Sequence, residues 1–181
     1  MSKIYTSKTH PQIYNIWNHM RRRCTNPKVW IKRPHYQGCT IHDLWKDFNN
    51  FAYCYENMVG YGLPGRQLDK DILFKGNKIY GPHTCVLVPQ DINIMFTSCK
   101  NARGSLPIGV SYDKNKRKYI SQCRLHGTRK FLGCYNTQEE AFMVYKKEKE
   151  AHIKEIAERY KHEIDPRLYF ALLNYEVEIT D

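Results

Sequence analysis

The chain has 181 residues and a formal net charge of +11 at pH 7, and 41% of its residues are apolar. That apolar share supports a folded core, which excludes a wholly disordered protein. No apolar run approaches the ~18 residues of a membrane span, and the start of the chain lacks the apolar segment of a secretory signal. We therefore expect a cytoplasmic protein. A basic, aromatic-rich composition is typical of proteins that bind nucleic acid.

The chain has seven cysteines, an odd number, and no two of them are spaced as Cys-x-x-Cys. This pattern favours neither a disulfide framework nor a four-cysteine zinc site, so we expect reduced thiols and no structural zinc. Cys24, Cys39 and Cys54 recur at equal steps, but the step is not a metal-ligand spacing. We interpret them as small buried apolar side chains.

Charge is segregated along the chain. Residues 1–100 hold 14 basic and 6 acidic side chains, and residues 137–181 hold 7 basic and 11 acidic ones. Between them, residues 101–136 hold eight basic side chains and a single acid, Asp113. Solubility alone gives no reason for this segregation, although a solvated basic face is the simpler alternative.

Helical spacing marks two segments near the start of the chain. Apolar residues from Ile13 to Met20 predict a helix capped by Thr9 and stopped at Asn26-Pro27. A basic loop is expected over residues 28–38. Aromatic and apolar side chains from Leu44 to Tyr55 then predict one second helix ending near Gly60.

The middle of the chain reads as strand, turn, strand and helix. Residues 67–73 alternate loosely, residues 75–78 favour a turn, and residues 85–88 form a short apolar run typical of a buried strand. Pro89 is suited to open a helix that continues through Asn93 and Phe96.

The last part predicts three short antiparallel strands followed by a long helix. The strands fall at residues 109–111, 118–124 and 130–135, and turn residues separate them. Thr137 and Glu140 have the spacing of a capping box at the start of the helix. Because three strands need a covering layer, we expect the helix to cover one sheet face and the basic residues to lie on the other.

Residues 109–160 resemble the Apetala-type (ethylene-response-factor) DNA-binding domain. The resemblance is carried by Gly109-Val110, by Tyr119 and by the run Leu-Gly-Cys-Tyr-Asn-Thr-Gln-Glu-Glu-Ala at residues 132–141. That family lays its sheet in the DNA major groove, which implies a DNA-binding set of Lys114, Lys116, Arg117, Lys118, Arg124, Arg129, Lys130 and Phe131. Plant members have Trp where Phe131 stands. Packing within the sheet is the alternative role for Phe131 and Tyr119.

Leu68-Asp69-Lys70 and, with a kept spacing, the stretch from Thr84 to Asn93 carry a second resemblance. They resemble the HNH nucleases of the ββα-metal fold, and Leu-Asp-Lys-Asp at residues 68–71 resembles the Leu-Asp-His-Asp of phage endonuclease VII. The resemblance implies that Asp69 and Asn93 bind Mg²⁺ (or Mn²⁺), which stabilises the leaving oxygen during phosphodiester cleavage. The alternative is a hairpin salt bridge between Asp69 and Lys70 and an ordinary helix amide at position 93.

Lys70 stands where the nuclease family has its catalytic histidine. Lysine is normally protonated at neutral pH, so this is a departure from the usual general base. Three readings stay open. Lys70 is a base or a phosphate clamp, His83 removes the proton instead, or the site is inactive. A plain surface turn is the alternative role for His83.

Together these features predict an α+β protein with three regions: an N-terminal helical region (1–62), an HNH-like ββα module (63–102) and an Apetala-type domain with a helical extension (103–181). The combination resembles phage homing endonucleases that nick duplex DNA in the host cytoplasm. A DNA-binding regulator without catalysis is the alternative. We expect a monomer.

Overall fold

The computed structural model describes residues 4–96 and 104–181 and has a mixed α+β fold. The chain forms two compact units. The first comprises residues 1–93 and 162–168, and the second comprises residues 94–161 and 169–181. The three regions predicted from the sequence stay a prediction.

The first unit begins with short helices. Their bounds are α1 Pro11–Thr25, α2 Pro27–Lys32, the 3₁₀ helix η1 Pro34–Tyr36, α3 Asp43–Lys46 and α4 Phe48–Glu56. The core beneath them is aromatic: Trp45 and Phe51 are fully buried and meet edge to face with ring centroids 5.1 Å apart. Trp17 joins them by donating a hydrogen bond from Nε1 to the carbonyl of Trp45, at 2.8 Å. The aromatic stripe of the sequence is therefore core.

Three predictions for the N-terminal region are wrong: a helix cap, a loop and the continuity of the second helix. His10, and not Thr9, occupies the N-cap position of α1, where its side chain forms no capping hydrogen bond, and the Thr9 hydroxyl contacts Thr6 instead. Residues 28–38 are largely helical, since the Asn26 side chain accepts from the Lys28 N–H and starts α2. The second helix is broken into α3 and α4, because Asp47 takes extended geometry and caps α4 through the Asn50 N–H.

Two small sheets complete the first unit. Strand β1 (Thr40–Ile41) pairs in parallel with β3 (Ile79–Tyr80). Strand β2 (Arg66–Asp69) pairs antiparallel with the fully buried β4 (Val86–Pro89), and helix α5 (Gln90–Met95) follows directly. The second predicted strand and the helix after it are present, but the first strand ends at Asp69 and not at Leu73. Strand β3 lies between β2 and β4 in the chain and pairs with β1, so the predicted HNH-like hairpin stays a prediction.

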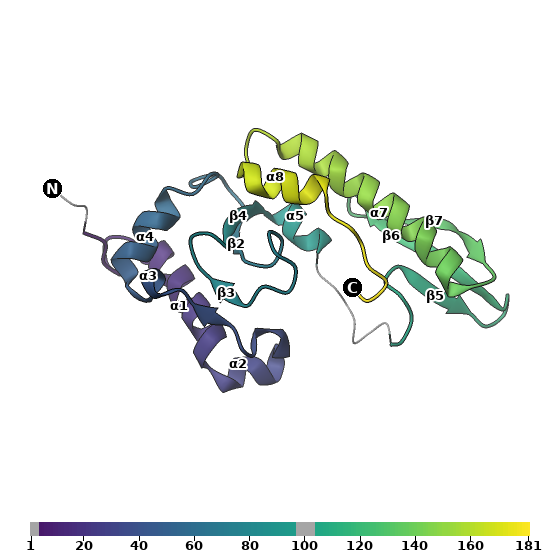
Figure 1. Ribbon diagram of the computed structural model, residues 1–181, viewed down its shortest axis with the longest axis horizontal. Coiled ribbons are helices and arrows are strands. Elements are labelled where there is room, and N and C mark those ends of the chain that lie inside the picture. The colour runs from purple at the N-terminus through teal and green to yellow at the C-terminus, as the bar shows by residue number, and fades with distance from the viewer. Residues whose placement is uncertain (1–3, 97–103) are drawn as a thin grey trace. The chain divides into compact units, whose positions relative to one another are not determined.

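The second unit contains one antiparallel sheet, ordered β5–β6–β7. Its elements are β5 Val110–Asp113, β6 Lys118–Leu125, β7 Thr128–Tyr135 and the long helix α7 Gln138–Tyr160. Helix α8 (Pro166–Leu173) follows. Figure 1 shows α7 lying along the sheet. The capping box of Thr137 and Glu140 is present, and the three strands and their covering helix confirm the predicted architecture.

Helix α7 buries an apolar stripe against the sheet, including Ala141, Tyr145 and Ile153. Gly109 is required for this packing. Its φ is +77°, and a Cβ at this position would lie 2.0 Å from the Tyr145 ring. Only glycine combines that backbone angle with so close an approach.

Candidate nucleic-acid interface and a carboxylate hairpin

The pairing register separates the sheet of the second unit into two faces. Val110, Ser121 and Cys123 are buried and face α7. Successive strand side chains alternate between faces, so Ile120, Gln122 and Arg124 point the other way. The register skips Leu132, so Gln122 pairs with Phe131 and Arg124 with Arg129. We call the face away from α7 the outer face.

The outer face carries two arginines directly opposite each other. Arg124 and Arg129 are exposed, and among the described residues neither forms a salt bridge. Like charges at opposed positions of a sheet destabilise it. The position therefore favours an external anion. Phe131, the neighbouring residue on this face, is 62% exposed, so it is not packed in the sheet.

The turn between β5 and β6 adds three exposed cations, Lys114, Lys116 and Arg117. Asp113 shapes this turn by accepting hydrogen bonds at Oδ1 from the N–H groups of Asn115 (2.9 Å) and Lys116 (3.1 Å). The acid of this basic stretch thus has a structural role, and its turn presents the cations to solvent.

The remaining two lysines of the predicted set have partners within the unit. Lys118 lies on the outer face and donates to the side chain of Asn136. Lys130 pairs with Cys123, on the face toward α7, and its amine lies 2.6 Å from Glu148 of that helix. The prediction that all the basic residues lie opposite the helix is therefore wrong for Lys130, because strand alternation turns it inward.

In the first unit, Asp69 lies at the end of β2 and Asn93 lies on α5. Oδ1 of Asp69 accepts from the N–H groups of Asp71 and Ile72, both at 2.8 Å. Burial raises the pKa of this carboxyl above its ordinary value, although the two backbone hydrogen bonds act in the opposite direction. The side chain of Asn93 donates to Gln67, which lies two residues before Asp69 and so on the same face of β2.

Lys70 is directed inward. It is 3% exposed, and its amine contacts the carboxylate of Asp71, donates to the carbonyl of Asn77 at 2.8 Å and lies 5.6 Å from the centre of the Tyr80 ring. An amine that is directed inward and already held by two acceptors is poorly placed to take a proton from an attacking water. Of the three readings of this position, the role of Lys70 as a base or as a phosphate clamp has the least support from its surroundings.

His83 lies exposed in the turn before β4. Its backbone carbonyl accepts a hydrogen bond from Nη1 of Arg167 at 3.2 Å. No hydrogen bond or ion pair joins its imidazole to Asp69 or Asn93 in the described part of the chain, and its catalytic role stays a prediction.

The equally spaced cysteines lie in or beside the aromatic core of the first unit. Cys39 is buried, and Cys24 and Cys54 pack against the same cluster. Burial, and to a smaller extent the nearby Cys39, raises the pKa of Cys24 to about 11. This thiol is protonated at neutral pH, as a packing side chain would be.

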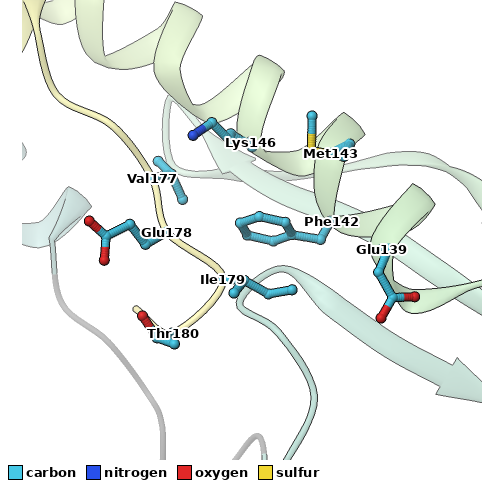
Figure 2. A pocket seen from close by; sticks show the side chains of 8 residues that line it. All are labelled: Glu139, Phe142, Met143, Lys146, Val177, Glu178, Ile179 and Thr180. Carbon is cyan, nitrogen blue, oxygen red and sulfur yellow. The ribbon is translucent and has the colours of Figure 1, made fainter.

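The second unit also has a shallow apolar hollow between α7 and the chain after α8. Phe142 and Met143 of the helix and Val177 and Ile179 of the C-terminal segment line it, as Figure 2 shows. Lys146 and two glutamates stand at its rim. It contains no converging set of polar groups of the kind that orients a small ligand.

Comparison of the chain with models of protein families, with curated protein sequences and with solved structures finds no match. Of the described helices, none is both long and apolar enough to cross a membrane.

Proposed function

We propose that the chain binds duplex DNA through the outer face of β5–β7, as an Apetala-type domain does. The observation that carries the proposal is the opposed pair Arg124 and Arg129, exposed and without a carboxylate partner among the described residues. Duplex DNA supplies a regular array of phosphates that would offset the repulsion between them.

The shape of this surface supports the same ligand. A two- or three-stranded β-ribbon fits the major groove of B-DNA. Arginines on the strands would reach base edges, where guanine N7 and O6 accept bidentate hydrogen bonds. The lysines of the β5–β6 turn would contact phosphates, and Phe131 offers an apolar surface suited to a thymine methyl group.

The test is a salt titration of duplex binding, followed by fluorescence anisotropy with the full chain. We expect Arg124→Ala and Arg129→Ala each to weaken binding roughly five- to tenfold at low salt and to reduce the salt slope by about 1. Lys154→Ala removes the same charge from an exposed site on α7 and is the matched control. Equal losses from all three variants would mean that net charge, and not the outer face, binds DNA.

Metal-dependent nicking of DNA, as in a phage homing endonuclease, is the second candidate activity. The order β2, β4, α5 and the location of Asp69 at the strand end favour it. Both hydrogen bonds of Asp69 end on Oδ1, which leaves Oδ2 for another ligand, and a divalent cation would offset the cost of burying this carboxylate. Asp69 and Asn93 offer the oxygen donors that Mg²⁺ and Mn²⁺ prefer. The cation would stabilise charge on the phosphorus and the leaving oxygen.

Asp69→Asn tests this activity without removing the turn, because the amide oxygen still accepts from the two N–H groups. We expect nicking of supercoiled plasmid with Mg²⁺ or Mn²⁺ to be lost and DNA affinity to be unchanged. The fold should be more stable at neutral pH, because a raised folded-state pKa means that the ionised carboxylate opposes folding. That gain should vanish as the pH falls below the ordinary pKa of 3.8.

The same assay separates the two functions. If wild-type protein binds DNA and nicks none with either metal, the chain is a DNA-binding regulator that has kept the nuclease scaffold. If Asp69→Asn nicks as well as wild type, Asp69 does not hold a catalytic metal.

A further inference from the structure

Two histidines and a glutamate meet at one end of the second unit. His126 occupies the two-residue turn between β6 and β7, and His152 and Glu155 lie one helical turn apart on α7. They line a surface hollow of about 570 Å³, and Arg129, Lys130 and Glu148 are also among its lining residues. Neither proposed activity uses these side chains.

The spacing of the three ligand atoms is that of a metal site. Oε2 of Glu155 lies 3.3 Å from Nε2 of His126 and 3.5 Å from Nδ1 of His152, and all three atoms lie within 4.8 Å of one another. Nitrogen and oxygen ligands about 2.1 Å from a tetrahedral Zn²⁺ are separated by roughly 3.4 Å. Two of the three separations therefore already match, and a small movement of the exposed His126 would complete the set.

His152 supplies a second, independent observation. The residue is 6% exposed, and within the described part of the chain its buried Nδ1 forms no hydrogen bond of good geometry, its contact with Oε2 of Glu155 being 3.5 Å long. A buried polar atom without a partner costs free energy, so such atoms are rare in folded proteins. Burial lowers the pKa of His152, although Glu155 acts against this. Neutral imidazole is the form that binds metals.

Glu155 is held in position for the same role. Its second oxygen, Oε1, accepts from Nη2 of Arg159 at 3.2 Å, which leaves Oε2 directed at the histidines. In metal centres, a residue that hydrogen-bonds to the other polar atom of a metal ligand commonly fixes that ligand's orientation.

We propose that His126, His152 and Glu155 form a binding site for a divalent transition metal, Zn²⁺ by preference. Two imidazoles and one carboxylate suit Zn²⁺ better than Mg²⁺ or Ca²⁺, which take oxygen ligands. A water molecule from the open hollow would supply the fourth ligand. The metal would tie the β6–β7 turn to α7 and so fix the hairpin end on which Arg124 and Arg129 stand.

The test is titration of the metal-free full chain with Zn²⁺ by calorimetry, together with the visible spectrum of the Co²⁺ form. We expect one equivalent to bind, the Co²⁺ spectrum to be that of a tetrahedral site, and Zn²⁺ to raise the melting temperature. His126→Asn removes one ligand and keeps a residue that tolerates the positive φ of 48° at this position.

In His126→Asn we expect the affinity for Zn²⁺ to fall by more than roughly 10–100-fold, which is the effect of losing a residue that only hydrogen-bonds to a metal ligand. Zn²⁺ should then no longer raise the melting temperature. His162→Asn alters another exposed histidine and should bind like wild type. Absence of saturable Zn²⁺ binding by the wild-type chain would overturn the proposal. So would binding by His126→Asn that equals wild type, since the ion would then lie elsewhere, for example on the exposed thiol of Cys134.

Discussion

The sheet β5–β7 and the two-stranded sheet β2–β4 are both antiparallel and followed by a helix, yet the cations of the two regions have opposite surroundings. On the sheet, Arg124 and Arg129 are opposed and exposed, and neither forms a salt bridge with any residue that the structure describes. Directly after β2, the candidate catalytic Lys70 is buried, and its amine contacts the Asp71 carboxylate and donates to a backbone carbonyl. A cation with internal partners stabilises its own fold, whereas an opposed pair of cations without them is the feature on which the proposed DNA binding rests.

The aspartates that end a strand in the two regions, Asp69 and Asp113, share one local structure. Asp69 and Asp113 each end a strand, and each accepts from the N–H groups two and three residues later. This is an Asx turn, for which aspartate is suited in any protein. The nuclease-like motif at Asp69 therefore coincides with an ordinary turn motif. What distinguishes Asp69 is its burial, which raises the pKa of its carboxyl.

The largest effect is expected from Gly109→Ala. This substitution disturbs the packing of the sheet against α7 and changes no side chain of the outer face. The new methyl group would lie 2.0 Å from the Tyr145 ring, and alanine is strained at a φ of +77°. We expect the second unit to lose about 3 kcal/mol or more of stability, and DNA binding to be lost with it. Thermal unfolding by circular dichroism measures the change.

Gly127→Ala is the matched control for this substitution. Its φ of +79° is nearly the same, but nothing lies within 4 Å of the added Cβ. The loss should be only about 1–2 kcal/mol, from backbone strain alone. Equal losses in the two variants would mean that the approach of Tyr145 is not what makes Gly109 necessary.

A smaller effect is expected from Lys70→Met, which tests the inward role of the lysine. The carbonyl of Asn77 and the carboxylate of Asp71 would lose a partner, at a cost of about 1–3 kcal/mol. DNA affinity, measured well below the melting temperature, should not change. Lys78→Met is the control, because the Lys78 amine also donates to a carbonyl, that of His35, but from an exposed position where water replaces it. A stability loss confined to Lys78→Met would contradict the structural role of Lys70.

The parts of this fold that the sequence predicts well are those where a local pattern determines the structure. The capping box of Thr137 and Glu140 and the run from Cys85 to Val88 needed only short-range information. The predicted helix between Leu44 and Tyr55 is wrong in its continuity, because Asp47 breaks it by capping α4. Apolar spacing reports which face is buried and does not report where a side chain interrupts the backbone.

The candidate sites were harder to predict, because side-chain direction depends on tertiary partners. Lys130 has the same sequence signal as Arg129, and only the strand register assigns it to Glu148 on the helix side. His126 and His152 are far apart in sequence, and the expectation of no structural zinc considered cysteine spacing alone. The i,i+3 spacing of His152 and Glu155 was the one local signal available for that cluster.

The smallest effect is expected from Asp113→Asn, which refines the comparison of the two acids. The amide oxygen keeps the hydrogen bonds from Asn115 and Lys116, so the turn should persist while one negative charge leaves the basic surface. We expect DNA affinity to rise about two- to fivefold at low salt, and the gain to shrink as salt screens the charges. Glu176→Gln, at an exposed site after α8, removes the same charge away from the sheet and should change affinity little. If the two variants gained equally, the benefit would come from net charge, and the β5–β6 turn would lie away from the bound DNA.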